Sequence, residues 1–224
     1  MHVVTTNKGP VALHYAELQA LARQNGVQIG IEGTVMSGTP AIRMGLDLLA
    51  GAGVNRVQGI LNGTTNYILT RMAEGVPYTD ALAEAQSQGY AEADPTGDVE
   101  GFDAAGKVVI LADVLMGASI TMADVDRQGI TKLTLEDIAD ARAEKMCWKL
   151  IARIEKTATG VKASVRPTLI PLADPLASVN GATNAITYST SLLGDVTLIG
   201  PGAGRLATGY AILCDLLAFA RTEK

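Results

Sequence analysis

The first 35 residues constrain the fold most, because their pattern predicts a β-strand, an α-helix and a second β-strand in succession. Residues 2–7 begin with β-branched side chains, and residues 10–25 carry apolar side chains at helical spacing. Gly26 follows, and glycine commonly stands just beyond the end of a helix. Residues 27–35 predict the next strand, parallel to the first. One such unit cannot form a sheet with two covered faces, so we expect the chain to enter an α/β fold partway through.

The rest of the chain alternates helical and extended patterns without repeats or a low-complexity linker. Thr39-Pro40 is a helix-start signal, and Thr134 with Asp137 matches a capping box that has Asp in place of Glu. The predicted helices span 39–49, 64–74, 79–88, a long segment ending near 115, 134–145 and 206–221. The predicted strands span 54–62, 147–157, 161–169, 183–190 and 195–199, with a turn or short helix at 175–179.

Composition excludes several classes of protein. Hydrophobic residues make up 48% of the chain and the mean hydropathy is +0.22, which predicts a large core and some surface covered by a partner chain. Aromatic residues are 4%, too few for base-stacking platforms. A net charge of -5 and a pI near 5.0 argue against nucleic acid as a partner.

Cysteine and histidine usage narrows the chemistry further. Cys147 and Cys214 are far apart, which fits a reducing compartment, and His2 and His14 are too few for a histidine-based zinc site. We expect no signal peptide and no membrane span, because the apolar runs are short and interrupted by charge. The predicted location is the cytoplasm.

Residues 89–107 form an acidic segment (GYAEADPTGDVEGFDAAGK) with no Lys or Arg before Lys107. Its carboxylates are Glu92, Asp94, Asp98, Glu100 and Asp103. Clustered carboxylates repel one another, so they indicate a cation, a hydrogen-bonding substrate or plain solvent exposure. Asp103 and Lys107 would share a helix face, which suits a proton donor beside a polar substrate. The alternative is an acidic loop followed by a surface ion pair.

Four other motifs lie where strands lead into helices. Lys8 follows the first strand, at the edge where parallel sheets bind ligands, or it is a solvated loop lysine. Residues 32–40 and 61–66 could hold an ion or a carboxylate, or they are ordinary helix-start segments. Residues 200–204 (GPGAG) precede a helix but lack both the GxGxxG and the P-loop patterns, so alone they indicate a phosphate-binding loop only weakly.

The order of these motifs is more specific than any one of them. Along the chain they read TTNKGP, EGTVMSGTP, GILNGTTNYILTRM, GYAEADPTGDVEGFDAAGK and GPGAG. This series closely resembles the homoserine dehydrogenases, and the resemblance covers essentially all 224 residues. It implies hydride transfer between NAD(P)H and aspartate 4-semialdehyde, which is interconverted with L-homoserine on the way to threonine and methionine.

The resemblance also implies roles for individual residues. Lys107 would be the general acid/base on the C4 oxygen of the substrate, and Lys8 a second active-site lysine near cofactor and substrate. Substrate-binding residues would be Glu92, Asp98, Asp103, Tyr90, Gly63 and Thr64. Residues near the nicotinamide half of NAD or NADP would be Lys8, Gly202, Ala203 and Gly204. A monovalent cation such as Na⁺ would be held, largely by backbone carbonyls, at Glu32, Val35, Ser37 and Thr39.

The implied fold is α/β (α+β), with three parts. Residues 1–38 would be a Rossmann-type strand–helix–strand remnant of an NAD(P)-binding domain. Residues 39–200 would be a substrate-binding and dimerisation domain with a mixed sheet and helices on one face, and residues 201–224 a helix returning to the nucleotide domain. We expect a homodimer. A lysine beside carboxylates has its ammonium form favoured, so we also expect homoserine oxidation to be fastest at alkaline pH.

Two features depart from the family pattern. Gly106 stands where an Arg usually precedes the lysine, and no Gly-rich turn precedes the first strand. Cofactor binding is therefore expected to be impaired in this chain. A non-enzymatic homodimeric relative is the first alternative, and another NAD(P)-dependent oxidoreductase acting on an amino-acid aldehyde is the second.

Overall fold

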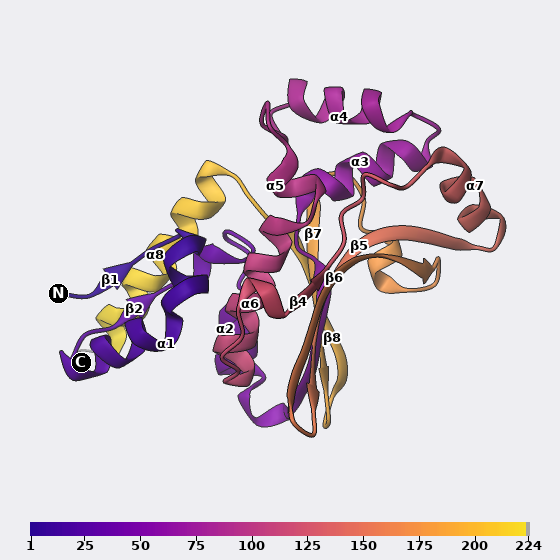
Figure 1. Cartoon of the computed structure of the whole chain (residues 1–224). Helices are drawn as coiled ribbons and strands as arrows, with labels where there is room; N and C mark the ends of the chain where they lie inside the picture. The colour runs from indigo at the N-terminus through magenta and orange to yellow at the C-terminus, as the bar shows by residue number, and fades with distance from the viewer. Residues whose placement is uncertain (223–224) are drawn as a thin grey trace.

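The computed structural model describes residues 1–222 and contains a two-stranded element and a six-stranded sheet (Figure 1). β1 (Val3–Val4) and β2 (Ile29–Gly30) pair in parallel, and α1 (Lys8–Gln24) connects them. Gly26 follows α1 with a φ of 62°, as its position in the sequence predicts. The C-terminal helix α8 (Arg205–Thr222) packs against β1 and β2. The predicted parallel strand–helix–strand start is confirmed.

The predicted strand over 27–35 is wrong beyond Gly30. A 3-10 helix, Glu32–Thr34, follows β2 directly. The side chain of Glu32 is buried, and its carboxylate accepts hydrogen bonds from the backbone N–H groups of Ile42 and Arg43, each at 2.9 Å. The chain therefore leaves the extended conformation to bring this carboxylate to the next helix.

The larger sheet has the strand order β4-β6-β5-β3-β7-β8. Its neighbours are antiparallel, except for the parallel pair β4 and β6, so the sheet is mixed as predicted. β4 is a three-residue strand that the sequence pattern does not predict. The strands are β3 (Val54–Ile60), β4 (Val125–Arg127), β5 (Met146–Thr157), β6 (Gly160–Pro171), β7 (Thr183–Thr190) and β8 (Gly194–Pro201).

Helices cover one face of this sheet and enclose the main core (Figure 1). The capping box predicted at Thr134 and Asp137 is present at the start of α7. The helices on this face are α3 (Gly63–Ala73), α4 (Tyr78–Ser87), α5 (Thr96–Val99), α6 (Phe102–Met116) and α7 (Leu135–Ala143). Short 3-10 helices span Met122–Asp124 and Pro175–Ser178. On the opposite face, a smaller apolar cluster around Ile60 and Ile151 lies near the second of these.

The predicted continuous helix over 39–49 is also wrong. The segment contains α2 (Ala41–Arg43), a π-helix (Met44–Leu48) and a 3-10 helix (Ala50–Ala52). Thr39 does not cap α2, because its hydroxyl donates to the carbonyl of Pro201 at 3.0 Å. Gly45 packs so closely on α6 that a Cβ there would lie 2.7 Å from the Leu115 side chain.

The helix α6 runs through the centre of the core and carries the lysine singled out by the sequence. Nine of its residues are buried, and Lys107 is among them. Gly101 at its start and Gly117 at its end both adopt positive φ angles, of 80° and 63°. Lys107 is therefore fixed on a rigid helix and not on a mobile surface loop. Within residues 1–222, none of the helices combines the length and the apolar character that a membrane span requires.

Candidate active site

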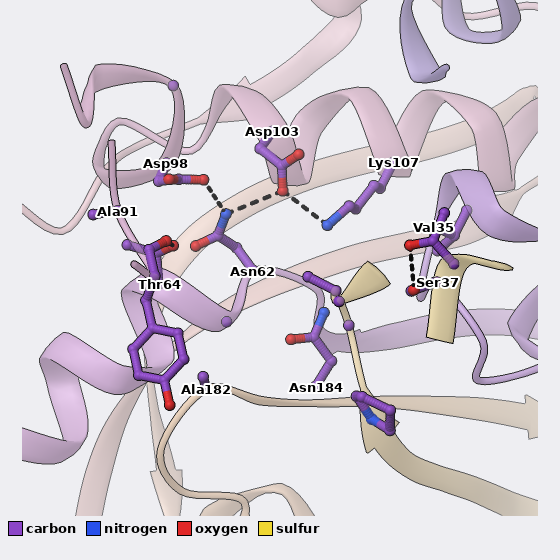
Figure 2. Close-up of a pocket in the computed structure, with 18 of the residues that line it drawn as sticks. Val35, Ser37, Asn62, Thr64, Ala91, Asp98, Asp103, Lys107, Ala182 and Asn184 are labelled. Atoms are coloured by element: carbon purple, nitrogen blue, oxygen red, sulfur yellow. Dashed lines mark hydrogen bonds and ion pairs between the residues drawn. The ribbon is translucent and has the colours of Figure 1, made fainter. Parts of the chain in front are cut away.

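A cavity of about 1220 Å³ lies where α3 and α6 begin and where β7 and β8 approach them (Figure 2). The segment after β1 and the loop after β2 complete its wall. Every substrate-binding and cofactor-binding residue predicted from the sequence lines this cavity. Two of the four predicted cation-site residues, Val35 and Ser37, line it as well. Such a volume suits a small substrate together with part of a cofactor.

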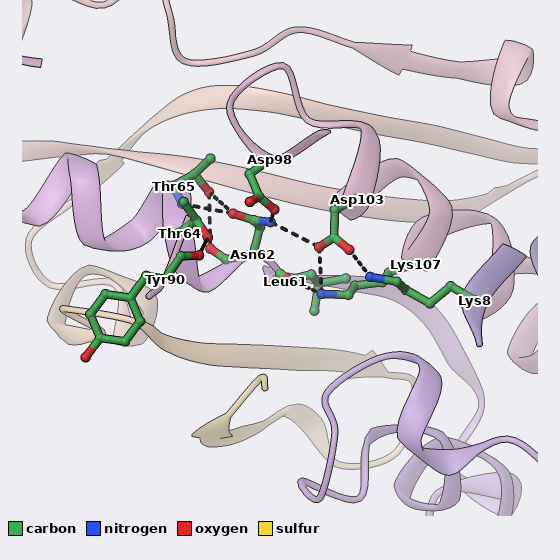
Figure 3. A network of polar contacts seen from close by, with 9 residues as sticks. All are labelled: Lys8, Leu61, Asn62, Thr64, Thr65, Tyr90, Asp98, Asp103 and Lys107. Atoms are coloured by element: carbon green, nitrogen blue, oxygen red, sulfur yellow. Dashed lines mark hydrogen bonds and ion pairs between the residues drawn. The ribbon is translucent and has the colours of Figure 1, made fainter. Parts of the chain in front are cut away.

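Asp103 lies between two lysines at one side of the cavity (Figure 3). Its Oδ2 is 2.8 Å from Nζ of Lys107, one helical turn further along α6, and its Oδ1 pairs with Lys8. The Lys107 ammonium also donates to the carbonyl of Leu61 at 2.6 Å. Because an ammonium group carries three protons, these two contacts leave one for a group inside the cavity.

The pKa of Lys107 shifts in the direction opposite to the expectation based on sequence. Burial lowers the pKa of Lys107 below its usual value, and the nearby Lys8 charge lowers it further. Asp103 opposes this shift without outweighing it. Neutral Lys107 therefore becomes accessible at a lower pH than for an ordinary lysine, which suits a group that must both give and take a proton.

The two nearby aspartates are tuned in opposite directions. Burial acts to raise the pKa of Asp103, but Lys107 and Lys8 on either side hold it below its usual range. Burial raises the pKa of Asp98, and the Asp103 charge adds to this effect, while a hydrogen bond from Asn62 opposes it. Asp103 is therefore a permanent anion, and Asp98 is a carboxylate that a bound cation would stabilise.

Asn62 connects these carboxylates to the start of α3. Its Nδ2 donates to Asp98 at 2.6 Å and to Asp103 at 3.0 Å, while its Oδ1 accepts from the backbone N–H of Thr65 at 2.9 Å. The same side chain thus caps a helix and holds two like charges together. The sequence pattern predicts the helix start in this segment but does not reveal the bridge.

The other substrate-binding candidates line the same cavity. Thr64 donates its hydroxyl hydrogen to the carbonyl of Tyr90 at 2.6 Å. Gly63 lies so close to the loop before β7 that a Cβ would stand 2.6 Å from the Ala182 carbonyl oxygen. Glu92 is exposed, so its carboxylate lies at the solvent side of the cavity.

The predicted cation-site residues use their side chains for other contacts. The Glu32 carboxylate accepts from two backbone N–H groups, as described above, and also faces the Arg43 guanidinium at 3.7 Å. Ser37 and Thr208 of α8 share a hydroxyl hydrogen bond of 2.8 Å, and Thr39 donates to Pro201. Within residues 1–222, no three His, Cys, Asp or Glu side chains gather as they would around a metal ion.

The cavity therefore combines a proton-transfer group with a set of carboxylates. Asp98 and Asp103 can stabilise a substrate ammonium or hydroxyl, and Lys107 can protonate an oxygen at the reacting carbon. The glycine-rich segment from Gly200 to Gly204 forms a wall with few side chains, against which a flat ring can lie. Sequence patterns alone do not reveal Asn62 as a bridge or Asn184 as a buried residue of this wall. For Asn62, the one sequence signal was its place in the segment NGTT at the start of α3.

Comparisons with known proteins agree with this arrangement. The homoserine dehydrogenase family model matches residues 40–217. An NAD(+)-dependent homoserine dehydrogenase from Pseudomonas canavaninivorans is 52% identical over 217 residues, which are 96% of this chain and 62% of that protein. A homoserine dehydrogenase from Sulfurisphaera tokodaii is 45% identical over 99% of this chain and 68% of its own length.

Solved structures give the same result. A homoserine dehydrogenase from Thiobacillus denitrificans superposes with a TM-score of 0.93 at 38% identity, covering 96% of this chain and 50% of that one. A hyperthermophilic archaeal homoserine dehydrogenase mutant in complex with NADPH gives a TM-score of 0.84 at 37% identity, covering 96% and 63%. This chain thus spans between about half and two-thirds of the proteins it matches. With a family match over most of its length and high identity to several members, the chain belongs to the homoserine dehydrogenase family.

Proposed function

We propose that this chain forms the substrate-binding and catalytic portion of a cytoplasmic homoserine dehydrogenase. The reaction is the NAD(P)-dependent interconversion of aspartate 4-semialdehyde and L-homoserine. The observation that carries this proposal is the buried Lys107, which shares Asp103 with Lys8 beside a second carboxylate, Asp98. An amino-acid substrate with an oxygen at C4 matches this combination of charges.

Each residue has a separate task in the proposed reaction. Asp98, with Glu92 at the rim, attracts the substrate ammonium, and Asp103 holds Lys107 towards the C4 oxygen. In the reducing direction Lys107 gives a proton to this oxygen and becomes neutral. In the oxidising direction neutral Lys107 takes the hydroxyl proton. Bound NAD(P)H or NAD(P)⁺ supplies or accepts the hydride at C4.

The cavity wall fits the nicotinamide half of such a cofactor. Gly200 and Gly202 line this wall and have no room for side chains, since a Cβ on Gly200 would lie 2.3 Å from Thr39 Oγ1 and one on Gly202 would lie 2.1 Å from Asn184 Nδ2. Lys8, Ala203 and Gly204 line the same region and would face the cofactor. Relatives carry both NAD(+) and NADPH in their names, so we propose a dinucleotide cofactor without choosing between the two.

A monovalent cation such as Na⁺ is part of the same proposal. The side-chain oxygens of Glu32, Ser37 and Thr39 are engaged in hydrogen bonds within the chain. Any cation at the loop that includes Val35 would therefore be held by backbone carbonyls, which suit hard cations.

We also propose a homodimer formed through the sheet face that the helices leave open. This face carries polar side chains that already interact with one another, such as Arg153 with Gln58 at 2.9 Å and Arg56 with Ser189 at 3.0 Å. Such groups can exchange hydrogen bonds across an interface. The expected mass by light scattering is twice 23.3 kDa.

Oxidation of L-homoserine with NAD⁺ or NADP⁺ tests the proposed reaction. It is measured for this chain and for the same chain extended at its N-terminus with the Gly-rich nucleotide-binding segment of a relative. We expect activity in the extended protein and its loss in Lys107→Ala, because the proton-transfer group is then absent. An extended protein that folds and binds cofactor but does not oxidise homoserine would instead support a non-enzymatic relative.

A further inference from the structure

One buried amide in the cavity wall lacks hydrogen-bond partners. Asn184, the second residue of β7, is 1% exposed, and within residues 1–222 neither its Oδ1 nor its Nδ2 has a partner. The buried amides of Asn62 and Asn66 are both well paired: Asn66 donates to three backbone carbonyls and accepts from Lys149. Buried polar groups are nearly always paired, so this exception indicates that a ligand completes the site.

Asn184 is placed to meet a ligand at the reacting end of the cavity. Figure 2 shows its amide directed towards the side where Asn62 and Lys107 lie. Its nearest backbone neighbours include two glycines. A Cβ on Gly202 would lie 2.1 Å from Nδ2, and a Cβ on Gly63 would lie 3.4 Å from Oδ1. Because Gly202 carries no side chain, only its backbone lies against the amide at this point of the cavity wall.

The chemistry of the amide selects the kind of group. Asn184 offers one acceptor and two donor hydrogens side by side, so a carboxamide, which has the same pair, can satisfy both ends at once. A carboxylate would satisfy Nδ2 and leave Oδ1 unpaired. The nicotinamide ring carries its carboxamide on the carbon next to the one that exchanges hydride. A residue that holds this carboxamide must therefore lie close to the reacting carbon.

We propose that Asn184 binds the nicotinamide carboxamide through two hydrogen bonds and thereby orients the ring towards the substrate. This assignment rests on the proposed function. Asn184 is then a positioning residue. It sets which face of the nicotinamide ring is turned towards C4 of the substrate, which lies beside Lys107.

The test uses this chain and three probes in binding titrations. Nicotinamide mononucleotide carries the carboxamide, nicotinic acid mononucleotide replaces it with a carboxylate, and ribose 5-phosphate lacks the ring. We expect the chain to prefer the carboxamide over the carboxylate by about tenfold or more, as the loss of a paired hydrogen bond implies. Asn184→Leu, or Asn184→Ala if the first variant does not fold, should bring the two affinities within about twofold and leave ribose 5-phosphate unchanged. Asn55→Leu, on an exposed site of β3, is the matched control that should keep the preference.

L-homoserine titrated in parallel separates this assignment from the proposed function. If the chain binds homoserine but shows equal affinity for the two mononucleotides, or no affinity for either, the assignment of Asn184 is wrong. It is also wrong if Asn184→Leu weakens homoserine binding and leaves nicotinamide mononucleotide unchanged, because the amide would then bind the amino acid. A chain that does not bind homoserine contradicts the proposed function itself.

Discussion

Asn62 is the residue on which two parts of the site depend. Replacing it with Ala removes both the cap of α3 and the hydrogen bonds to Asp98 and Asp103, so we expect a loss of about 1–2 kcal/mol in the free energy of unfolding. Urea unfolding measures this loss. Asn62→Asp keeps a capping oxygen but adds a third carboxylate. It should therefore be more destabilised at pH 7, where this carboxylate is charged, than near pH 4. Wild-type stability in Asn62→Ala would mean that the bridge is dispensable.

The pH dependence of homoserine oxidation follows from Lys107. Oxidation needs the neutral amine, and burial lowers the pKa of Lys107 from its ordinary value of 10.5. We therefore expect kcat/KM in the extended protein to rise with pH and to level off below 10.5.

Two neighbours should move this profile in opposite directions. Lys8→Met removes a positive charge that lowers the pKa of Lys107, so the midpoint should shift to higher pH. Asp103→Asn removes the charge that raises it, so the midpoint should shift to lower pH. A rate that does not change with pH would contradict Lys107 as the base.

The sequence predicts contacts between residues correctly where their spacing on one helix determines whether they meet. Asp103 and Lys107 are four apart on a helix, and the structure places them in contact. The direction of the Lys107 pKa shift was not predictable, because it depends on a burial that tertiary packing creates. The unpaired amide of Asn184 was not predictable either, since an Asn within a predicted strand gives no sign of whether its side chain has hydrogen-bond partners.

At the level of single elements, Gly106 is a weak point of α6. It lies in the helix interior, and a Cβ there would meet open space, so Gly106→Ala should gain about 1 kcal/mol. For a chain of this size that raises the melting temperature by about 2–4 °C, which calorimetry resolves.

Gly101, at the start of the same helix, provides the matched comparison. Its φ is 80°, and a Cβ at this position would lie 3.2 Å from the Val165 side chain, so Gly101→Ala should destabilise the protein. A shift of the same sign in both variants would contradict the distinction between the two glycines.

The element predictions fail where a long-range contact overrides the local pattern. The strand over 27–35 ends at Gly30, and the Glu32 carboxylate beyond it accepts a hydrogen bond from α2. The helix over 39–49 changes from α to π at Met44, beside Gly45, which packs on Leu115. β4 is only three residues long and pairs with β6, which lies far along the chain. In contrast, β7 and α7 lie where they are predicted, and the capping box that starts α7 is a local signal.

Across the whole molecule, one ion pair ties the C-terminal helix to the rest. Asp215 of α8 is 2.7 Å from the Arg43 guanidinium and accepts the backbone N–H of Glu32 at 3.1 Å. Asp215→Ala leaves Arg43 and Glu32 without this partner, so we expect faster hydrogen exchange in α8, β1 and β2. Asp140→Ala, at an exposed position of α7, is the control and should leave hydrogen exchange in α8, β1 and β2 unchanged. Unaltered exchange in Asp215→Ala would mean that the other contacts of α8, such as the Ser37–Thr208 hydrogen bond, hold it without this ion pair.

The exposed apolar side chains of this chain do not gather on the sheet face that we propose as the dimer interface. Apart from the apolar cluster around Ile60 and Ile151, the open sheet face carries polar pairs such as Arg153 with Gln58, whereas α8 exposes a row of large apolar side chains. These are Leu206, Tyr210, Leu213, Leu216 and Leu217. The apolar composition by itself therefore does not identify the sheet as the surface that a partner chain would cover.

The most direct test of the proposed site is a titration of this chain with L-homoserine and with 2-aminobutyrate, which lacks the hydroxyl group. If Lys107, held by Asp103, binds the C4 oxygen, homoserine should bind about tenfold tighter or more, and Lys107→Met should remove most of that difference. Equal affinities for the two amino acids in the wild-type chain would contradict the central claim that this buried lysine faces the reacting oxygen.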